Sequence, residues 1–459
     1  MIEKYYSGVI EQIYNRIGKE TRNIVMANYS NDFSIENLEV IRRYQSNEDN
    51  VFFAYSEFSY NTLVGAYEPF LDIICNMHRR FIGGSFDDFQ KECGVYYLHR
   101  QVLNSYYETG ECFREETVLL NEVAYEQRRM TMAIVDMLKR LSEVRPLMIV
   151  INRFQMASKS SIETIKYLID NPCTNIGIVL GVNVQVKGTD STVEVWDRIV
   201  ESLEDRSAIY YIGSAGQQKN HIRDTSDDEL YITTNFEQSI QEASNIMEFL
   251  DYEQAKRGCR IIEHKIKFED AWIDEKSLRR FYLIYARTSV LLGEMSKAIE
   301  LTNEYKALIP ESDSEHYFSI YYFMKGTCYM YQGKLEKAEG CAKKAYDYAL
   351  LADDELLEFK SELLSVMIKM SGWYNIFFCV QDIPVSDEFI EKIIKHGYRN
   401  HLAHIYIYAY DNSRDVVKQS FYDESLLKHF TKGLELAKKI GNEQLVYDAY
   451  QKIIMLAST

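Results

Sequence analysis

Phosphate binding is the first chemistry for which the residue pattern can be tested. A phosphate-binding loop follows a buried strand as Gly-x-x-x-x-Gly-Lys-Ser/Thr, because glycine lets backbone N–H groups approach phosphate oxygens and lysine neutralises their charge. The segment after the apolar run 24–26 ends in Ser34, as the pattern requires. Ala27 and Asp32 stand where the two glycines are needed, and Phe33 replaces the lysine. Asp32 would also place a carboxylate against the phosphates, so we expect no nucleotide cofactor here.

A pair of carboxylates that organise Mg²⁺ is the second chemistry to test, and it would follow the apolar run 147–151. The residues at this point are Asn152 and Arg153. Neither side chain can replace two acids in holding Mg²⁺ or in activating an attacking water. We therefore predict that the chain is not an enzyme and has no catalytic residue at this position.

Metal binding and nucleophilic catalysis find little support elsewhere. His396, His401 and His404 lie close together in the sequence, but their spacing does not align all three on one helical face. No neighbouring cysteine or acid completes a metal pattern, so we interpret them as surface or structural histidines. The eight cysteines form no Cys-x-x-Cys pair, and neither Gly-x-Ser-x-Gly nor His-Glu-x-x-His occurs. We predict no metal site.

The elements that would position these residues are short strands separated by helices. Apolar runs typical of buried strands occur at 24–26, 51–54, 147–151, 176–180 and 208–212. Strands that alternate with helices predict a parallel sheet covered on both faces, and such sheets bind ligands beyond the carboxyl ends of their strands. Both motifs tested above lie at these ends.

The segment 151–162 reads Ile-Asn-Arg-Phe-Gln-Met-Ala-Ser-Lys-Ser-Ser-Ile. It resembles the Walker B region of STAND-type signalling ATPases, in which the strand precedes two acids, an Ala-Asp pair and a serine that opens the next helix. Ala157 and Ser161 match this pattern. The two residues after the strand and Ser158 replace the acids, so the resemblance implies no catalytic role for them.

A second segment, Tyr67-Glu68-Pro69-Phe70, resembles the Tyr-x-Pro-Phe/Leu that opens a helix after the second strand in these ATPases. The resemblance covers roughly residues 20–213 in the correct order. It implies an α/β parallel-sheet, P-loop NTPase-like domain that has lost its catalytic residues. The alternative is that these segments are ordinary strand-to-helix loops of another α/β domain.

A helical repeat is visible in the second half of the chain. Gly293-Glu-Met-Ser-Lys-Ala298 and Gly333-Lys-Leu-Glu-Lys-Ala338 have the same form, and they are 338 − 298 = 40 residues apart. Both resemble the turn between tetratricopeptide helices, where glycine permits the turn and alanine permits close packing. The period exceeds the usual ~34 residues, so longer helices are expected. We predict an all-α, tetratricopeptide-like solenoid that binds a protein or peptide partner.

These patterns predict three regions: a degenerate P-loop NTPase-like domain at 1–213, a linker at 214–235 and the helical domain at 236–459. The net charge of −17 argues against nucleic acid as a partner. The sequence contains no apolar run of the roughly 20 residues that cross a membrane, and it begins without a signal peptide pattern. With cysteines that form no disulfide framework, these features predict a cytoplasmic protein.

Together these features predict a non-catalytic sensory or regulatory module that acts through protein interaction. Residues 445–459 resemble the linker helix that enters GGDEF diguanylate cyclase domains, and residues 51–80 and the whole layout resemble the N-terminal halves of certain cytosolic bacterial GGDEF proteins. The resemblance implies control of a C-terminal diguanylate cyclase domain. The Gly-Gly-Asp/Glu-Glu-Phe signature is not in this sequence, and a homodimer is compatible with the resemblance. The alternatives are a free-standing tetratricopeptide adaptor or transcription-regulator-like scaffold, and a divergent nucleotide-binding ATPase.

Overall fold

The computed structural model of this protein forms two compact units. We call Met1–Val95, Val102–Phe113 and Glu122–Trp272 the sheet unit, and Tyr96–Gln101, Arg114–Asn121 and Ile273–Thr459 the helical unit. The structure describes residues 2–30, 33–36, 38–46, 50–59, 63–114, 116, 120–186, 193–212, 235–268, 273–371, 385–409 and 424–457.

A five-stranded parallel sheet forms the centre of the sheet unit, in the order β2-β3-β4-β1-β5. Each of the five predicted apolar runs is a strand, which confirms the α/β class of this part of the chain. The strands are β1 (Ile24–Tyr29), β2 (Phe52–Glu57), β3 (Leu147–Asn152), β4 (Ile176–Asn183) and β5 (Ile209–Tyr211).

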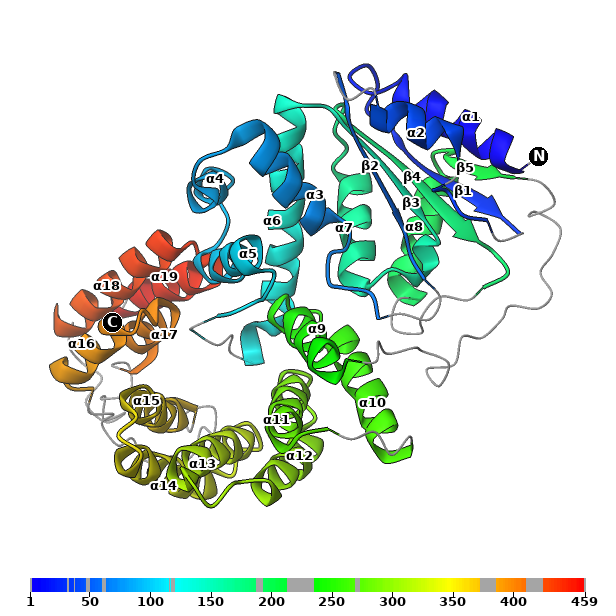
Figure 1. The fold of residues 1–459 in the computed structure, drawn as a ribbon. Helices are drawn as coiled ribbons and strands as arrows, with labels where there is room; N and C mark the ends of the chain where they lie inside the picture. Colours follow the sequence, from blue (N-terminus) through cyan, green and yellow to red (C-terminus); the bar gives the residue numbers. More distant parts are fainter. Residues whose placement is uncertain are drawn as a thin grey trace. The chain divides into compact units, whose positions relative to one another are not determined.

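Helices cover both faces of this sheet (Figure 1). Apolar side chains of α1 pack with alternate residues of the strands, such as Val25, Ala27 and Tyr29 of β1, because successive strand residues point to opposite faces. The helices are α1 (Ile2–Tyr14), α2 (Glu39–Ser46), α3 (Phe70–Met77), the π-helix η1 (His78–Ile82), α4 (Phe86–Glu92), α6 (Val123–Val144), the 3₁₀ turn η3 (Phe154–Met156), α7 (Lys159–Asp170), α8 (Val193–Glu204), α9 (Phe236–Glu248) and α10 (Tyr252–Phe268). Helix α5 (Tyr97–Thr109) and the turn η2 (Leu120–Glu122) contribute residues to both units.

Helices α9 and α10 belong to the sheet unit, although the sequence pattern groups them with the helical domain from residue 236. The predicted linker 214–235 lies outside the described residues except for Asn235, which caps α9 by accepting a hydrogen bond from the N–H of Gln238. Helical periodicity marks an apolar face on a helix, but it does not say which neighbour covers that face.

The helical unit consists of helices that pack mainly on their neighbours along the chain from α11 to α15 (Figure 1). This arrangement confirms the predicted all-α character of this part of the chain. The helices are α11 (Glu275–Leu291), α12 (Met295–Ala307), α13 (Ser314–Tyr331), α14 (Leu335–Leu351), α15 (Glu355–Ser371), α16 (Asp387–Lys395), α17 (Arg399–His404), the π-helix η7 (Ile405–Ala409), α18 (Glu424–Ile440) and α19 (Glu443–Ala457).

The two turns singled out in the sequence have the same backbone geometry. Gly293 and Gly333 have φ values of +77° and +70°, which L-amino acids with a side chain rarely adopt. At both turns the glycine N–H bonds the carbonyl three residues earlier, and the next N–H bonds the carbonyl five residues earlier. Ala298 and Ala338, on the following helices, are completely buried. Each turn therefore ends one helix in a Schellman-type cap and lets the next pack closely.

Candidate functional site at the strand ends

The described residues at the degenerate phosphate-loop and Walker B positions lie around the carboxyl ends of the parallel strands. Tyr29 at the end of β1 pairs in register with Asn183 of β4, and Glu57 at the end of β2 pairs with Asn152 of β3. Ala27 lies inside β1, because the strand runs to Tyr29 instead of opening into a loop after residue 26. Its backbone is thus held in the sheet.

Three aromatic side chains fill the space at these strand ends, and we call them the aromatic plug: Tyr6, Tyr29 and Phe33. The ring of Phe33 lies 5.2 Å from that of Tyr6 and 4.8 Å from that of Tyr29, both in edge-to-face geometry. A Cβ atom placed on Gly181 would lie 2.4 Å from the Tyr6 hydroxyl, so the packing leaves no room even for a methyl group. Phe33 therefore supplies packing surface where a phosphate loop supplies lysine.

The hydroxyl of Tyr6 is held in an apolar setting. Tyr6 is fully buried, and burial, followed by the negative charge of Glu57, raises the pKa of its phenol well above its ordinary value. Burial therefore favours the neutral phenol at this place.

Asn152 uses both ends of its amide to hold the plug in place. Its Oδ1 accepts a 2.8 Å hydrogen bond from the Tyr29 hydroxyl, and its Nδ2 donates a 3.0 Å hydrogen bond to the carbonyl of Phe33. The side chain is completely buried. An aspartate here would be a buried charge facing the Phe33 carbonyl, so the amide suits this position better than an acid would.

Glu57 gathers the hydrogen-bond donors that lie around the plug. Its Oε2 accepts hydrogen bonds of 2.9 Å from the Ser34 hydroxyl and 3.0 Å from the N–H of Ile35. Its Oε1 lies 3.1 Å from a guanidinium nitrogen of Arg153. Both charged side chains are more than four-fifths buried. We call this set the Glu57 latch, because one carboxylate joins the segment after β1 to the segment after β3.

The latch shows what Ser34 and Arg153 do in this fold. Arg153 adopts a left-handed backbone conformation with φ of 55°, and it also donates to the carbonyl of Phe58 at 3.3 Å. Ser34 donates to a carboxylate of the chain itself. The donors that an oxyanion would need are thus directed at Glu57. Asp32 lies outside the described residues.

The segments 67–70 and 151–162 contact each other beside the sheet. The N–H of Tyr67 donates to the hydroxyl of Ser160 at 2.9 Å, and the hydroxyl of Ser161 donates to the carbonyl of Glu68 at 2.7 Å. Ser160 N–H in turn donates to the buried carboxylate of Asp251 at 3.1 Å. These hydrogen bonds link the start of α7 to the segments that precede α3 and α10.

Asp251 is the buried acid of this network. Burial raises the pKa of its carboxyl above the ordinary value, and the hydrogen bonds from Ser160 and Gln254 only partly offset this effect. Asp251 also caps α10, where its Oδ1 accepts from the N–H of Gln254 at 3.4 Å. Its role is thus structural.

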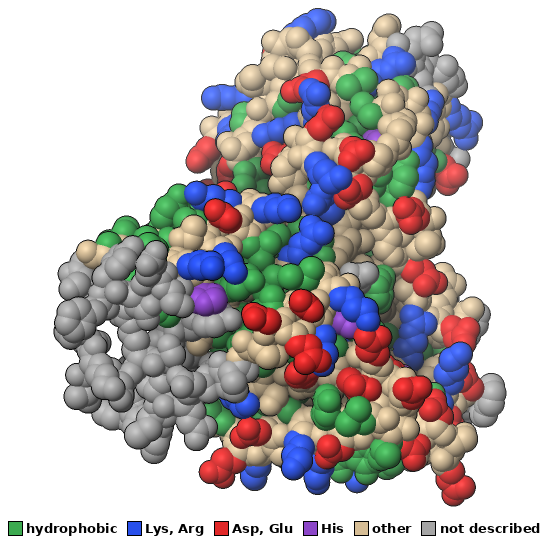
Figure 2. All heavy atoms as spheres, turned by 90° about the vertical axis from the view of Figure 1, so that its left-hand side faces the viewer, with side chains coloured by type: hydrophobic (Ala, Val, Ile, Leu, Met, Phe, Trp, Pro, Cys, Tyr) green, Lys and Arg blue, Asp and Glu red, His purple; other side chains and the backbone are tan. Residues whose placement is uncertain are grey.

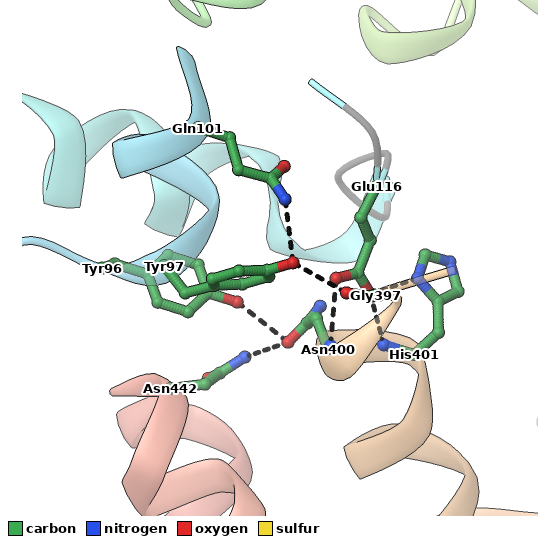
Figure 3. Close-up of polar contacts among 8 residues, drawn as sticks. All are labelled: Tyr96, Tyr97, Gln101, Glu116, Gly397, Asn400, His401 and Asn442. Carbon is green, nitrogen blue, oxygen red and sulfur yellow. Dashed lines mark hydrogen bonds and ion pairs between the residues drawn. The ribbon is translucent and has the colours of Figure 1, made fainter. Parts of the chain in front are cut away.

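A second buried polar cluster lies within the helical unit (Figure 3). One carboxylate, that of Glu116, accepts from the N–H groups of Asn400 and His401 at 3.1 and 2.6 Å, and it lies 2.6 Å from Nδ1 of His401. Asn400 Oδ1 accepts from the Tyr96 hydroxyl and from Nδ2 of Asn442, both at 2.9 Å. All of these side chains are buried, so the cluster stabilises the fold and offers no open site.

The first residues of α5 extend this cluster. The hydroxyl of Tyr97 donates to the carbonyl of Gly397 at 2.7 Å and accepts from Nε2 of Gln101 at 2.8 Å (Figure 3). Residues 96–101 and 116, which lie between β2 and β3 in the sequence, are thereby part of the helical unit.

The three histidines have separate surroundings in the structure. His401 contacts Glu116, His396 stacks on Phe359 with ring centroids 4.5 Å apart, and His404 stacks on Tyr408 at 5.7 Å. Among the described residues no group of three or more side chains is placed to hold a metal ion. No acid lies close to His401 in the sequence, but Glu116, 285 residues away along the chain, lies close to it in space.

Sequence reasoning missed Glu57, Tyr6 and Glu116. Glu57 left one signal, an acid at the end of an apolar run, whereas Tyr6 and Glu116 lie in segments without any motif. Among the described helices, none has the length and hydropathy to span a membrane. We found no protein-family model that matches the chain and no match among curated proteins.

Proposed function

We propose that this protein is a non-catalytic regulatory and protein-interaction module, built from a degenerate STAND-type P-loop domain and a tetratricopeptide-like helical array. The strand order β2-β3-β4-β1-β5 supports the first assignment. It places one strand, β4, between the strand of the phosphate loop and the strand of the Walker B region, as in ATPases of the STAND and AAA types.

The observation that carries the proposal is that the protein's own side chains fill the space at the strand ends. A nucleotide site needs glycines, a lysine and paired acids at this place. The chain instead has the aromatic plug, the amide of Asn152 and the carboxylate of Glu57 there. An internal carboxylate on these donors opposes phosphate both by filling the space and by its charge.

The helical unit supports a role in protein interaction. Stacked helices with repeated turns present long surfaces to peptides or to other domains. Figure 2 shows a face on which acidic side chains (red) are frequent over the lower part and basic ones (blue) are scattered among them. The net charge of the whole chain, −17, favours protein partners over nucleic acid.

The resemblance to regulatory halves of cytosolic GGDEF proteins supplies the class of effector that we propose, a diguanylate cyclase domain in the cytoplasm. Expressing the chain fused at its C-terminal helix to a diguanylate cyclase domain, in bacteria that carry a cyclic di-GMP reporter, tests this part. We expect a reporter level that differs from that given by the cyclase domain alone. An unchanged level together with a stable protein partner recovered from the cells favours the free-standing adaptor.

Turnover measurements test the non-catalytic part. The purified chain is incubated with ATP and Mg²⁺ and phosphate release is followed, with the Ser34→Ala variant as the control. We expect no release above buffer from either protein. Mg²⁺-dependent release that the Ser34→Ala substitution abolishes would instead establish a divergent ATPase.

A further inference from the structure

A groove runs between α14 and α15 in the helical unit, and its lining combines acids with a buried hydroxyl. Its volume is about 520 Å³. We call it the α14–α15 groove; Glu336, Glu339, Gly340, Lys343 and Tyr346 line it from α14, and Ser361 and Glu362 line it from α15. A space of this size accommodates one or two side chains of a bound segment.

Gly340 keeps this groove open. It lies in the interior of α14, where glycine weakens a helix relative to alanine. A Cβ atom added to Gly340 would meet nothing within 4 Å, so the fold itself gives no steric reason for the glycine. Gly326 in α13 differs, because its Cβ would lie 3.1 Å from a methyl group of Leu364. The absent side chain at 340 leaves depth in the groove.

The charges around the groove favour a cationic occupant. Glu336 and Glu339 are exposed, and no described residue forms an ion pair with either of them. Glu362 is already paired with Lys392 of α16 at 3.1 Å. Lys343 is the groove's own cation. The lining thus has three carboxylates and one lysine, and the carboxylates of Glu336 and Glu339 are not engaged in an ion pair with a described residue.

Ser361 adds a polar group that lacks a partner. Its side chain is 1% exposed, and its hydroxyl forms no hydrogen bond with any described residue. A buried hydroxyl without a partner is unfavourable, and a donor from a ligand would relieve this cost. Tyr346, half-buried on the opposite helix, offers a ring face on which a cation can rest.

We propose that the α14–α15 groove binds a lysine- or arginine-bearing segment of a partner protein. One cationic group of the segment lies beside the carboxylates of Glu336 and Glu339, and a second donor of the same segment reaches the Ser361 hydroxyl further along the groove. Arginine fits best, because its planar guanidinium offers five donors and stacks on aromatic rings. This inference rests on the proposed protein-interaction function and identifies one surface for it.

Isothermal titration calorimetry on the full chain tests the proposal with three synthetic nine-residue peptides of glycine and serine. They carry two arginines, two lysines or two citrullines at the same positions, and citrulline keeps the shape of arginine without its charge. At 0.15 M salt, long-range attraction to the acidic chain is largely screened. We expect one saturable site for the arginine peptide, weaker binding of the lysine peptide, and at least tenfold weaker binding of the citrulline peptide.

The Gly340→Leu variant is the decisive comparison, because it fills the groove and changes no charge. We expect it to fold with an unchanged circular dichroism spectrum and to bind the arginine peptide at least tenfold more weakly. Gly8→Leu is the matched control, since Gly8 lies inside α1 and a Cβ there also meets nothing within 4 Å. It should bind as the wild type does.

Three results would overturn the proposal: no binding of the arginine peptide, equal binding of the citrulline peptide, or full binding by Gly340→Leu. None of them bears on ATP turnover or on the cyclic di-GMP reporter. Conversely, a positive turnover assay would overturn the non-catalytic function without touching the groove. The two failures are therefore distinguishable.

Discussion

The carboxylate of Glu116 lies 2.6 Å from Nδ1 of His401, although the two residues are 285 positions apart in the sequence. Both side chains are buried in the helical unit. Glu116 also accepts the N–H groups of Asn400 and His401, so the start of α17 depends on an acid from a segment that precedes β3. A residue from the N-terminal half of the chain thus accepts the first N–H groups of a helix that lies near the C-terminus of the chain.

Replacing Glu116 by glutamine should destabilise the helical unit. The substitution replaces a carboxylate that accepts two backbone N–H groups by an amide, whose NH₂ group would face these donors, and this should cost about 3 kcal/mol. Urea unfolding followed by far-ultraviolet circular dichroism measures the change. Glu92→Gln, at an exposed position, is the control and should change the stability by less than about 0.5 kcal/mol. A Glu116→Gln variant as stable as this control would show that the contact is unimportant.

Removal of the Tyr6 hydroxyl and removal of the Tyr29 hydroxyl should change the stability of the protein in opposite directions. The Tyr6 hydroxyl is buried and forms no hydrogen bond with a described residue, so Tyr6→Phe should stabilise the protein by up to about 1 kcal/mol. Tyr29→Phe removes the hydrogen bond to Asn152 and should destabilise it by about 1 kcal/mol. Thermal unfolding of the two variants side by side checks this. The same sign for both would contradict the plug geometry.

Substitution by alanine at two glycines of the same repeat should change the stability in opposite directions. Gly333→Ala forces a side chain into a turn with φ of +70° and should cost about 1 kcal/mol. Gly340→Ala lies in a helix interior with open space and should gain about 1 kcal/mol. Denaturant midpoints of the two variants relative to the wild type measure both effects. A stabilising Gly333→Ala would be inconsistent with the turn.

Asp251 should make the stability of the sheet unit pH-dependent. Because burial raises its folded-state pKa above the unfolded value, the folded chain holds this proton more tightly. Its favourable contribution is complete below the unfolded pKa of about 3.9 and is lost as the pH rises through the folded pKa. Asp251→Asn should therefore flatten the pH dependence of unfolding across this window. An unchanged profile would mean that Asp251 does not titrate differently in the fold.

Much of the fold followed from local patterns. All five strands were predicted, because each is an apolar run between polar segments. The apolar residues of such a run are enough to indicate a buried strand. The turns at Gly293 and Gly333 were visible because their backbone geometry needs glycine. The sequence did not show that α9 and α10 belong to the sheet unit. Helical periodicity marks an apolar face, but it does not specify which element packs against that face.

The candidate site was only half visible in the sequence. The loss of phosphate chemistry at Phe33 and Arg153 could be seen as missing residue types. What replaced it could not, because Tyr6 comes from α1 and Glu57 from β2, and their contacts arise only once the sheet has formed. Missing motif residues show what a site cannot do, whereas the filling of the space depends on tertiary packing.

Nucleotide binding is the measurement that tests the central claim most directly. Isothermal titration calorimetry of the full chain with ATP and with ADP, each with Mg²⁺, should give no saturable heat up to millimolar nucleotide, because the aromatic plug and the Glu57 latch fill the strand ends. Saturable one-to-one binding that Ser34→Ala or Arg153→Ala weakens would contradict this account and place a working nucleotide site at the strand ends.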